Sequence, residues 1–361
     1  MKTTKAFSLK AAYLSMAVAT LALSACGGGG SGSATGSGSG NNGGNGGSGG
    51  SGGTGVTCTA PQVLVNGVCT TPAPSVTPAN LQTSVPAPTY AASSDELAAF
   101  NEINAIRKLI GLGLLAQNAL LDKSANNHMK YGVANPTSNP HFEDPLKAGF
   151  TGVSPTDRAA FVGYTGNAGE VLSFGNGLDA VKGLVNTIYH RDNLLNQTTE
   201  HVGISFIPTD IAPVVDIELG IIKGQRNASD FLTTYPFDGQ KNLPLQMAPE
   251  WPSPFGLVNT EYATKTSSPV AFYSASGTSL AVSSFTVSQG ANLLTGRVLT
   301  SANDTNGLIA KNAASWLGSA PFQPNTVYTA SFTGTVNGVA VSKTWTFTTG
   351  TSAQLGGGSA Q

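Results

Sequence analysis

Apolar side chains recur at helical spacing soon after residue 93, and this pattern predicts the first helix of a folded domain. Ser93 can cap its N-terminus while Glu96 reaches back to the cap, and Gly111 suits its C-terminal end. Between them the apolar positions lie three or four residues apart, as one buried helix face requires: Leu97, Phe100, Ile103, Ile106 and Ile110.

A second helix is predicted over residues 118–133, where the apolar positions again keep to one face. His128 lies on that face beside Leu121 and Ala125. A histidine in such a place is more often packed and hydrogen-bonded than a ligand, and we expect the packed state here.

In the remainder of this domain, the pattern of apolar residues predicts strands after helices. A strand-like run begins at residue 169, and a helix over residues 178–189 leads to His190, which then lies where a helix gives way to a loop. Two apolar strands, His201–Ile207 and Val214–Ile221, predict an antiparallel hairpin. Helices first and strands last indicate an α+β layered domain over residues 91–231, called here the first domain.

Residues 232–350, called here the C-terminal domain, are rich in Thr, Ser and Val and show short runs that alternate apolar and polar positions. Turn residues separate these runs, and Asn337-Gly338 predicts a final two-residue hairpin. The pattern predicts an all-β sandwich with Phe332, Trp345 and Phe347 in its core. The strand candidates are residues 270–273, 279–287, 297–299, 327–333 and 339–349. Residues 351–361 are expected to be a flexible tail.

The first 25 residues have the pattern of a secretory signal peptide. Three lysines precede the apolar run 11–23, which is too short to favour a spanning helix. The run ends in Leu23-Ser24-Ala25-Cys26, which resembles the bacterial lipobox, whose cysteine is lipidated and begins the mature chain. The resemblance implies a membrane anchor on Cys26 and, in a Gram-negative cell, the outer membrane. A plain signal peptide with an incidental cysteine is the alternative.

Residues 26–57 are nearly all Gly and Ser, which predicts a flexible tether. Cys58 and Cys69 bound the next segment, residues 58–69, where we expect a small hairpin closed by a disulfide, followed by a Pro/Ser/Thr spacer over residues 70–90. Neither globular domain contains a cysteine, which excludes a thiol nucleophile or a Cys-ligated zinc site there.

Charge argues against some classes of partner. The formal net charge is -1 and charged residues make up 10% of the chain, so nothing favours nucleic acid or an anionic membrane surface. Low charge together with 45 glycines and 20 prolines is typical of a secreted, loop-rich protein.

Six short segments of the first domain stand in a recognisable order. They are NEINAIR at residues 101–107, LDKSANNHM at 121–129, PHF at 140–142, Arg158 followed by GY and GE up to residue 170, HRDNLL at 190–195 and VGI at 202–204. Together they resemble the CAP superfamily (cysteine-rich secretory, antigen 5 and pathogenesis-related 1 proteins) in its bacterial form. The resemblance implies an α/β/α sandwich with a surface cleft. The end of the C-terminal domain is similar to bacterial Ig-like domains.

In this family two histidines and one or two glutamates line the cleft, and some members bind a divalent metal there. The matching residues are His141, Glu170 and His190. The resemblance makes these three the candidates for the ligand cleft, for a site that holds zinc or another divalent metal, and for catalysis. Alternatively, the histidines hydrogen-bond to Glu170 and hold loop to sheet without any chemistry.

The sequence departs from the eukaryotic pattern at Thr187, where a second glutamate often stands, and it offers no clear Ser or Cys nucleophile. We therefore predict a cell-envelope lipoprotein whose cleft binds a lipid, a glycan such as peptidoglycan, or a surface protein, without turnover. The alternatives are a divalent-metal-dependent, peptidase-like hydrolase that uses the same cleft, and a structural or adhesive surface protein. We expect the C-terminal domain to be a spacer or an adhesion module.

Overall fold

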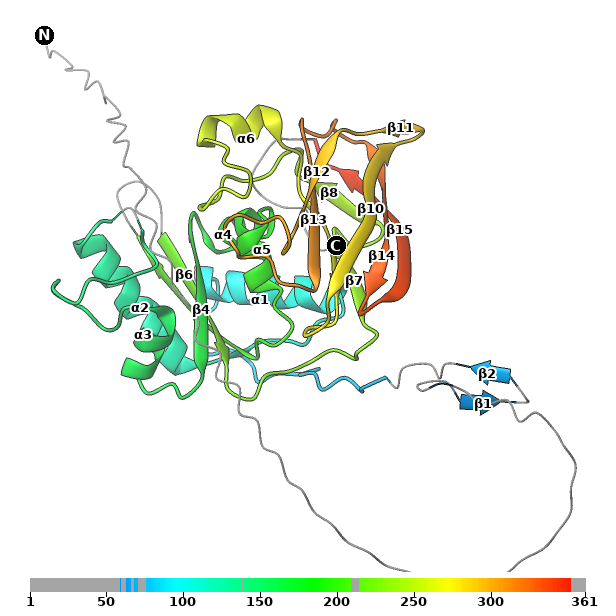
Figure 1. Cartoon of the computed structure of the whole chain (residues 1–361). Helices are drawn as coiled ribbons and strands as arrows, with labels where there is room; N and C mark the ends of the chain where they lie inside the picture. The colour runs from blue at the N-terminus through cyan, green and yellow to red at the C-terminus, as the bar shows by residue number, and fades with distance from the viewer. Residues whose placement is uncertain are drawn as a thin grey trace, which may run out of the picture. The chain divides into compact units, whose positions relative to one another are not determined.

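The computed structural model describes residues 59, 63–65, 68–70, 76–137, 139–208 and 214–351 (Figure 1). The predicted signal peptide, Cys26, the tether and Cys58 lie outside the described residues, as do residues 352–361. The chain divides into two compact units, residues 1–72 and 73–361. Within the described part, no helix has the length and apolar character needed to cross a membrane.

In the first unit, β1 (Val63–Val65) pairs with β2 (Val68–Thr70) in an antiparallel register that places Val65 opposite Val68. This register leaves two residues for the turn, so the strands of the predicted hairpin are confirmed. The expected disulfide between Cys58 and Cys69 stays a prediction, because Cys58 is not among the described residues.

A four-stranded sheet in the order β3-β5-β6-β4 forms the centre of the first domain. The strands β5 and β6 make the predicted antiparallel hairpin with the predicted bounds, and β4 pairs with β6 as an edge strand. The inner strand β6 is buried along most of its length, as expected of a strand covered on both faces. The bounds are β3 (Ala116–Gln117), β4 (Asn167–Phe174), β5 (His201–Ile207) and β6 (Val214–Ile221).

Helices cover both faces of this sheet. The helices α2 and α3 pack against one face, and α1, α4 and α5 lie on the other (Figure 1). The predicted α/β/α sandwich is therefore confirmed. The bounds are α1 (Asp95–Leu109), α2 (Ala119–Ala134), α3 (Pro155–Phe161), α4 (Gly177–Val185) and α5 (Tyr189–Leu194).

The N-terminus of α1 differs from the prediction by one residue. Ser94, not Ser93, is the cap, and its hydroxyl accepts the backbone N–H of Leu97 at 3.1 Å. Ser93 cannot cap, because it precedes the helix in a left-handed conformation with a φ of 63°. The predicted α2 is confirmed, with Asn118 as its cap.

Two sheets form the predicted β-sandwich of the C-terminal domain, in the orders β11-β10-β14-β15-β8 and β12-β13-β9-β7. Phe332, Trp345 and Phe347 lie in its core as predicted. Asn337 and Gly338 both have positive φ and join β14 to β15 as the expected two-residue turn. The bounds are β7 (Leu232–Tyr235), β8 (Gln240–Leu243), α6 (Asn259–Lys265), β9 (Val270–Ser274), β10 (Leu280–Gln289), β11 (Asn292–Leu293), β12 (Gly296–Thr300), β13 (Ala313–Gly318), β14 (Val327–Val336) and β15 (Val339–Thr349).

One hydrophobic cluster joins the two domains. Leu184 and Leu194 of the first domain belong to the same buried cluster as Tyr235 and Tyr273 of the C-terminal domain. The guanidinium of Arg191 lies 4.8 Å from the centre of the Tyr235 ring, and it also donates to a carbonyl of the C-terminal domain. The C-terminal domain is thus packed onto the first domain, and its role as a spacer or an adhesion module stays a prediction.

Candidate functional site

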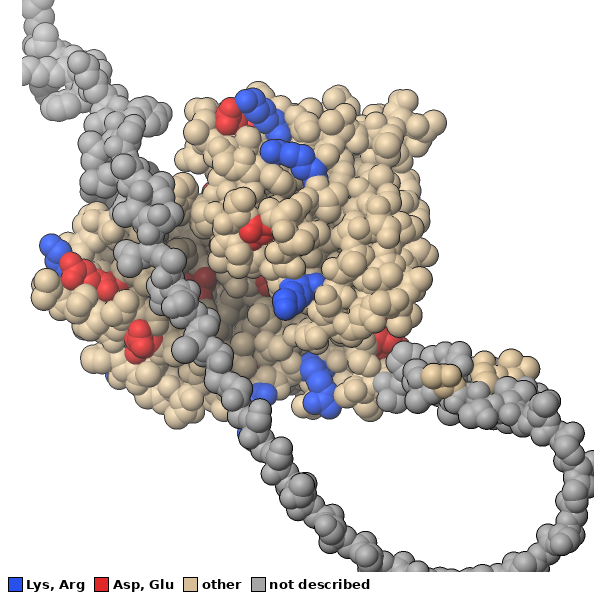
Figure 2. Space-filling view, in the orientation of Figure 1, with Lys and Arg blue, Asp and Glu red and all other residues tan. Residues whose placement is uncertain are grey.

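A cleft of about 1110 Å³ follows the edge strand β4, between α2 on one side and α4 and α5 on the other. Figure 2 shows the surface hollowed here, with acidic side chains inside the hollow. Its apolar lining residues are Met129, Val133, Leu172, Phe174, Leu184, Val214 and Trp251. Its polar side chains include His128, His141, Thr187, His190 and Glu250.

The first His–carboxylate pair joins a loop to the sheet. Strand β4 holds Glu170 inward, and its carboxylate Oε1 lies 2.9 Å from His141 Nδ1 while its other oxygen accepts from the Arg158 guanidinium. Burial alone would raise the pKa of Glu170, but the hydrogen bond from His141 and the charge of Arg158 lower it below its ordinary value. The carboxylate is therefore ionised near neutral pH and can only accept.

The second pair involves a residue from the C-terminal domain. His190 Nδ1 lies 3.0 Å from Glu250 Oε2, and Glu250 belongs to the segment between β8 and α6. Its carboxylate is buried, while His190 is 13% exposed and lines the cleft. His190 is thus held by a residue sixty positions later, in the other domain.

The prediction that His190 ends a helix is wrong. The helix stops at Val185, and His190 lies in the first turn of the next helix, α5. The helix ends there because side chains occupy carbonyl oxygens that the next helical turn would use. The Thr187 hydroxyl donates to Leu184 O, and Arg191 Nε donates to Val185 O. A continuous helix would have used these carbonyls for residues 188 and 189.

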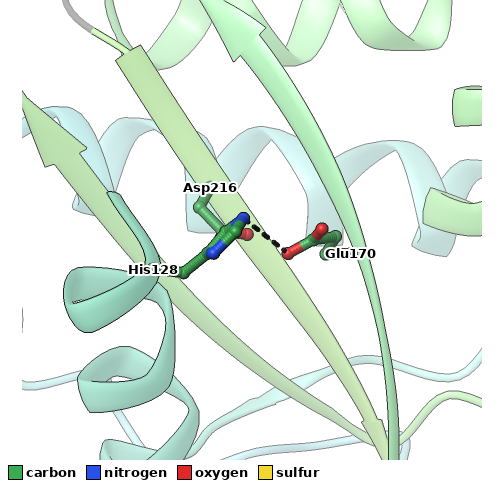
Figure 3. A group of neighbouring side chains, drawn as sticks. All are labelled: His128, Glu170 and Asp216. Atoms are coloured by element: carbon green, nitrogen blue, oxygen red, sulfur yellow. Dashed lines mark ion pairs between the residues drawn. The ribbon is translucent and has the colours of Figure 1, made fainter. Parts of the chain in front are cut away.

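A buried ionic cluster lies beside the cleft. Ligand atoms of His128, Glu170 and Asp216 lie within 4.8 Å of one another (Figure 3). His128 Nδ1 is 2.9 Å from Glu143 Oε1, and the Ser124 hydroxyl donates to the neighbouring Glu218. The prediction that His128 is packed and hydrogen-bonded is confirmed, since its side chain is 1% exposed.

Two acids of this cluster bind protons tightly. Burial, followed by repulsion from Glu170, raises the pKa of Asp216 well above its ordinary value and that of Glu218 to about 8. Neither oxygen of Asp216 has a hydrogen-bond partner among the described residues. A neutral Asp216 avoids the large cost of an unpaired buried charge.

The cluster does not fit a divalent metal. Both ring nitrogens of His128 face acceptors, Glu143 Oε1 at 2.9 Å and Pro140 O at 2.8 Å, which leaves no lone pair for a metal. The Glu170 oxygen nearest to His128 is already bonded to the cationic Arg158. A metal here would have to break these contacts.

The cleft histidines fit a metal better. His141 and His190 each use Nδ1 to contact a buried carboxylate, and Nε2 of neither ring has a partner within the described part of the chain. Carboxylates orient metal-binding histidines in this way. Among the described residues, however, the predicted set His141, Glu170 and His190 does not form a group whose ligand atoms all lie within 4.8 Å.

Comparison with known proteins identifies the first domain. The family model "CAP: Cysteine-rich secretory protein family" matches residues 100–210. Residues 100–210 are a CAP domain.

Two solved structures are similar to the chain. An outer surface protein from Borrelia burgdorferi is 23% identical with a TM-score of 0.32, and the match covers 36% of this chain and 93% of that one. An extracellular protein containing a SCP domain from Bacillus anthracis strain Ames is 24% identical with a TM-score of 0.31, covering 36% and 40%. No curated protein matches the chain.

Of the three predicted cleft residues, the CAP domain brings His141 and His190 to the cleft and buries Glu170 beside it. His141 and Glu170 are in contact, whereas His190 pairs with Glu250. Sequence reasoning missed Glu250, because it stands in a loop without periodicity, far along the chain. An acidic residue beside Trp251 and between two prolines, in a chain with few charges, was the one available signal.

Proposed function

We propose that this protein is a cell-envelope lipoprotein, anchored through Cys26, whose CAP cleft binds an amphipathic ligand without turning it over. The observation that supports this proposal is the composition of the cleft. Its walls are mostly apolar, and its polar groups include two histidines, each held by a buried carboxylate. A large apolar cleft with a few placed polar groups is typical of small-molecule sites.

Among lipid, glycan and protein ligands, the lining favours a lipid. An acyl chain or another apolar body can displace water from the walls, at a gain of about 25 cal/mol per Å² of apolar surface buried. A glycan would bury hydroxyl groups against these walls without hydrogen-bond partners, which costs free energy. The head of the ligand then lies near His141 and His190.

A pyrene-labelled long-chain alcohol tests this proposal. Trp251 lines the cleft, whereas the other two tryptophans, Trp316 and Trp345, belong to the core of the sandwich, so Trp251 reports on the cleft most directly. We expect saturable energy transfer from tryptophan to pyrene, reduced in Trp251→Phe. The protein would be the mature chain with Cys26→Ser, which carries no lipid of its own.

Gly132→Phe narrows the cleft without a packing clash. Gly132 lines the cleft on α2, and a Cβ built there meets nothing within 4 Å. The variant should weaken binding of the alcohol at least ten-fold, which is about 1.4 kcal/mol. Gly169→Phe is the matched control, because Gly169 is equally open but does not line the cleft. Equal binding by wild type and Gly132→Phe would disprove a ligand in this cleft.

The anchor has its own test. In a Gram-negative host, the wild-type chain should fractionate with the outer membrane, and Cys26→Ser should release it to the soluble fraction. A wild-type chain recovered from the soluble fraction would remove the lipoprotein part of the proposal and leave the cleft unaffected.

A metal-dependent hydrolase is the second candidate, favoured by the Nε2 atoms of His141 and His190, which have no partner among the described residues. These two residues would hold the metal, and a bound zinc would supply an activated water. Calorimetry with Zn²⁺ near neutral pH should then show binding by the wild type that His141→Ala abolishes. No binding, or no turnover of peptides and wall fragments with zinc, calcium or magnesium present, would exclude this candidate.

A further inference from the structure

The segment that carries Glu250 is fixed to the junction between α4 and α5. The backbone N–H of Ala248 donates to Asn186 O at 3.0 Å, and the Asn186 amide donates to Gln246 O at 2.7 Å. On its other side, the Tyr262 hydroxyl donates to Glu250 O. These contacts hold the Glu250 backbone in place from both domains.

The Glu250 carboxylate contacts the beginning of α5 at several atoms. Its Oε1 accepts the backbone N–H of Ile188 at 2.9 Å, and its Oε2 accepts that of Tyr189 at 3.0 Å. The same Oε2 lies 3.0 Å from His190 Nδ1. The carboxylate is fully buried, so these contacts are not shared with solvent.

This contact sets the proton position on His190. A carboxylate can only accept, so the hydrogen bond requires a proton on Nδ1. In the neutral ring the lone pair then lies on Nε2. This atom has no partner among the described residues, and it is not one of the buried side-chain atoms that lack a hydrogen bond. His141 has the same arrangement with Glu170. The cleft therefore presents two imidazole acceptors.

We propose that Glu250 is a positioning residue of the cleft: the C-terminal domain supplies the carboxylate that keeps His190 in the Nδ1–H form and makes Nε2 an acceptor for a hydrogen-bond donor on the ligand. This inference rests on the proposed function in placing a ligand in this cleft. It adds that the head of the ligand carries a hydroxyl or amide proton. It also explains why the C-terminal domain is packed against the cleft.

Glu250→Gln tests whether the carboxylate keeps the proton on His190 Nδ1. Glutamine offers one oxygen in place of two: with that oxygen at the Oε1 position it still accepts the N–H of Ile188, whereas its amide lies at the Oε2 position, loses the N–H of Tyr189 and presents a donor to His190 Nδ1. The ring must then move its proton to Nε2. One of the two backbone hydrogen bonds to α5 is lost in this variant, so the stability of the protein should fall slightly, whereas the tautomer should invert.

Nitrogen-15 NMR of the histidine rings measures the tautomer directly. In histidine-labelled protein, at a pH where the rings are neutral, wild-type His190 should show a protonated Nδ1 and a bare Nε2, with the assignment made by loss of these signals in His190→Gln. Glu250→Gln should reverse the two. Glu261→Gln, at an exposed pair with Lys265, is the control and should change nothing. A wild-type ring protonated on Nε2 overturns the proposal, and this wild-type measurement decides even if the variant fails to fold or turns its glutamine oxygen toward His190.

A matched pair of probes tests the consequence for binding. Wild type should bind the pyrene-labelled alcohol about ten-fold more tightly than its methyl ether, which has no proton to donate, because one hydrogen bond is lost. Glu250→Gln should lose this preference. Equal binding of both probes by wild type would contradict the acceptor role of Nε2. If neither probe binds, the proposed function is wrong, while the NMR result still decides what Glu250 does to His190.

Discussion

Replacing Asp192 with Asn should make the stability of the protein less sensitive to a rise in pH from about 4 to about 7. Asp192 follows His190 and Arg191 in α5, and its Oδ1 accepts the hydroxyl of Tyr273 from the C-terminal domain at 2.8 Å. The residue is partly exposed, but Oδ2 is enclosed and has no partner among the described residues. Burial therefore raises the pKa of Asp192 from 3.8 to about 7.

The raised pKa of Asp192 fixes the sign of the effect. The folded state binds the proton more tightly, so the free energy of unfolding falls as pH rises from about 4 and stops falling above about 7. Between pH 5 and pH 9 the wild type should lose about 3 kcal/mol from this group. Asn keeps the oxygen that accepts from Tyr273 and cannot ionise, so Asp192→Asn should lack this loss.

Urea unfolding at pH 5, 7 and 9 measures the difference. The free energy of unfolding of Asp192→Asn, relative to wild type, should increase by about 3 kcal/mol from pH 5 to pH 9, with most of the change below pH 7.5. Asp230→Asn, at an exposed position, is the control and should follow the wild type. A constant difference between Asp192→Asn and wild type across this range would show that Asp192 ionises as freely in the folded state as in the unfolded one.

Three further substitutions test the packing of the protein by the same urea unfolding. Arg158→Met removes the cation that accompanies the buried Glu170 and should cost about 3–5 kcal/mol; a loss below 1 kcal/mol would show that the acids there are already neutral. Gly203→Ala places a Cβ 2.2 Å from the Leu121 backbone and should cost about 2 kcal/mol or more, since α2 must move off β5; unchanged stability would refute this contact. Trp345→Ala should cost about 3–5 kcal/mol through the cavity it leaves, and a near-neutral result would contradict a single packed core in the sandwich.

Local periodicity predicted the elements that local sequence stabilises. The bounds of β5 and β6 are those predicted, because each is a mostly apolar run next to turn residues. The final strand β15 also has its predicted bounds, set by the Asn337-Gly338 turn. Strand β13 was missed, because its small residues show no alternation even though the whole strand is buried.

The candidate site was predictable only in part. The segments that resemble CAP proteins identified His141, Glu170 and His190 as cleft residues, and the structure places all three at or beside one cleft. The partner of His190 could not be predicted, because no sequence pattern links it to Glu250 across sixty residues. The protonated acids Asp216 and Glu218 were missed for a related reason: alternation within β6 does not show that four acids and one arginine share a buried space.

The sequence by itself determined most of the order of elements and the sandwich, because these depend on periodicities of two and about four residues along the chain, and it indicated the CAP domain through six segments that resemble that family. Tertiary structure alone decided where the helix before His190 ends. That break requires Thr187, Arg191 and Glu250 to take hydrogen bonds that a continuous helix would have made, and Glu250 comes from the other domain. The cleft is therefore built by both domains. Sequence patterns cannot predict this, because the hydrogen bond between His190 and Glu250, sixty positions apart, forms only once folding has closed the loop between them.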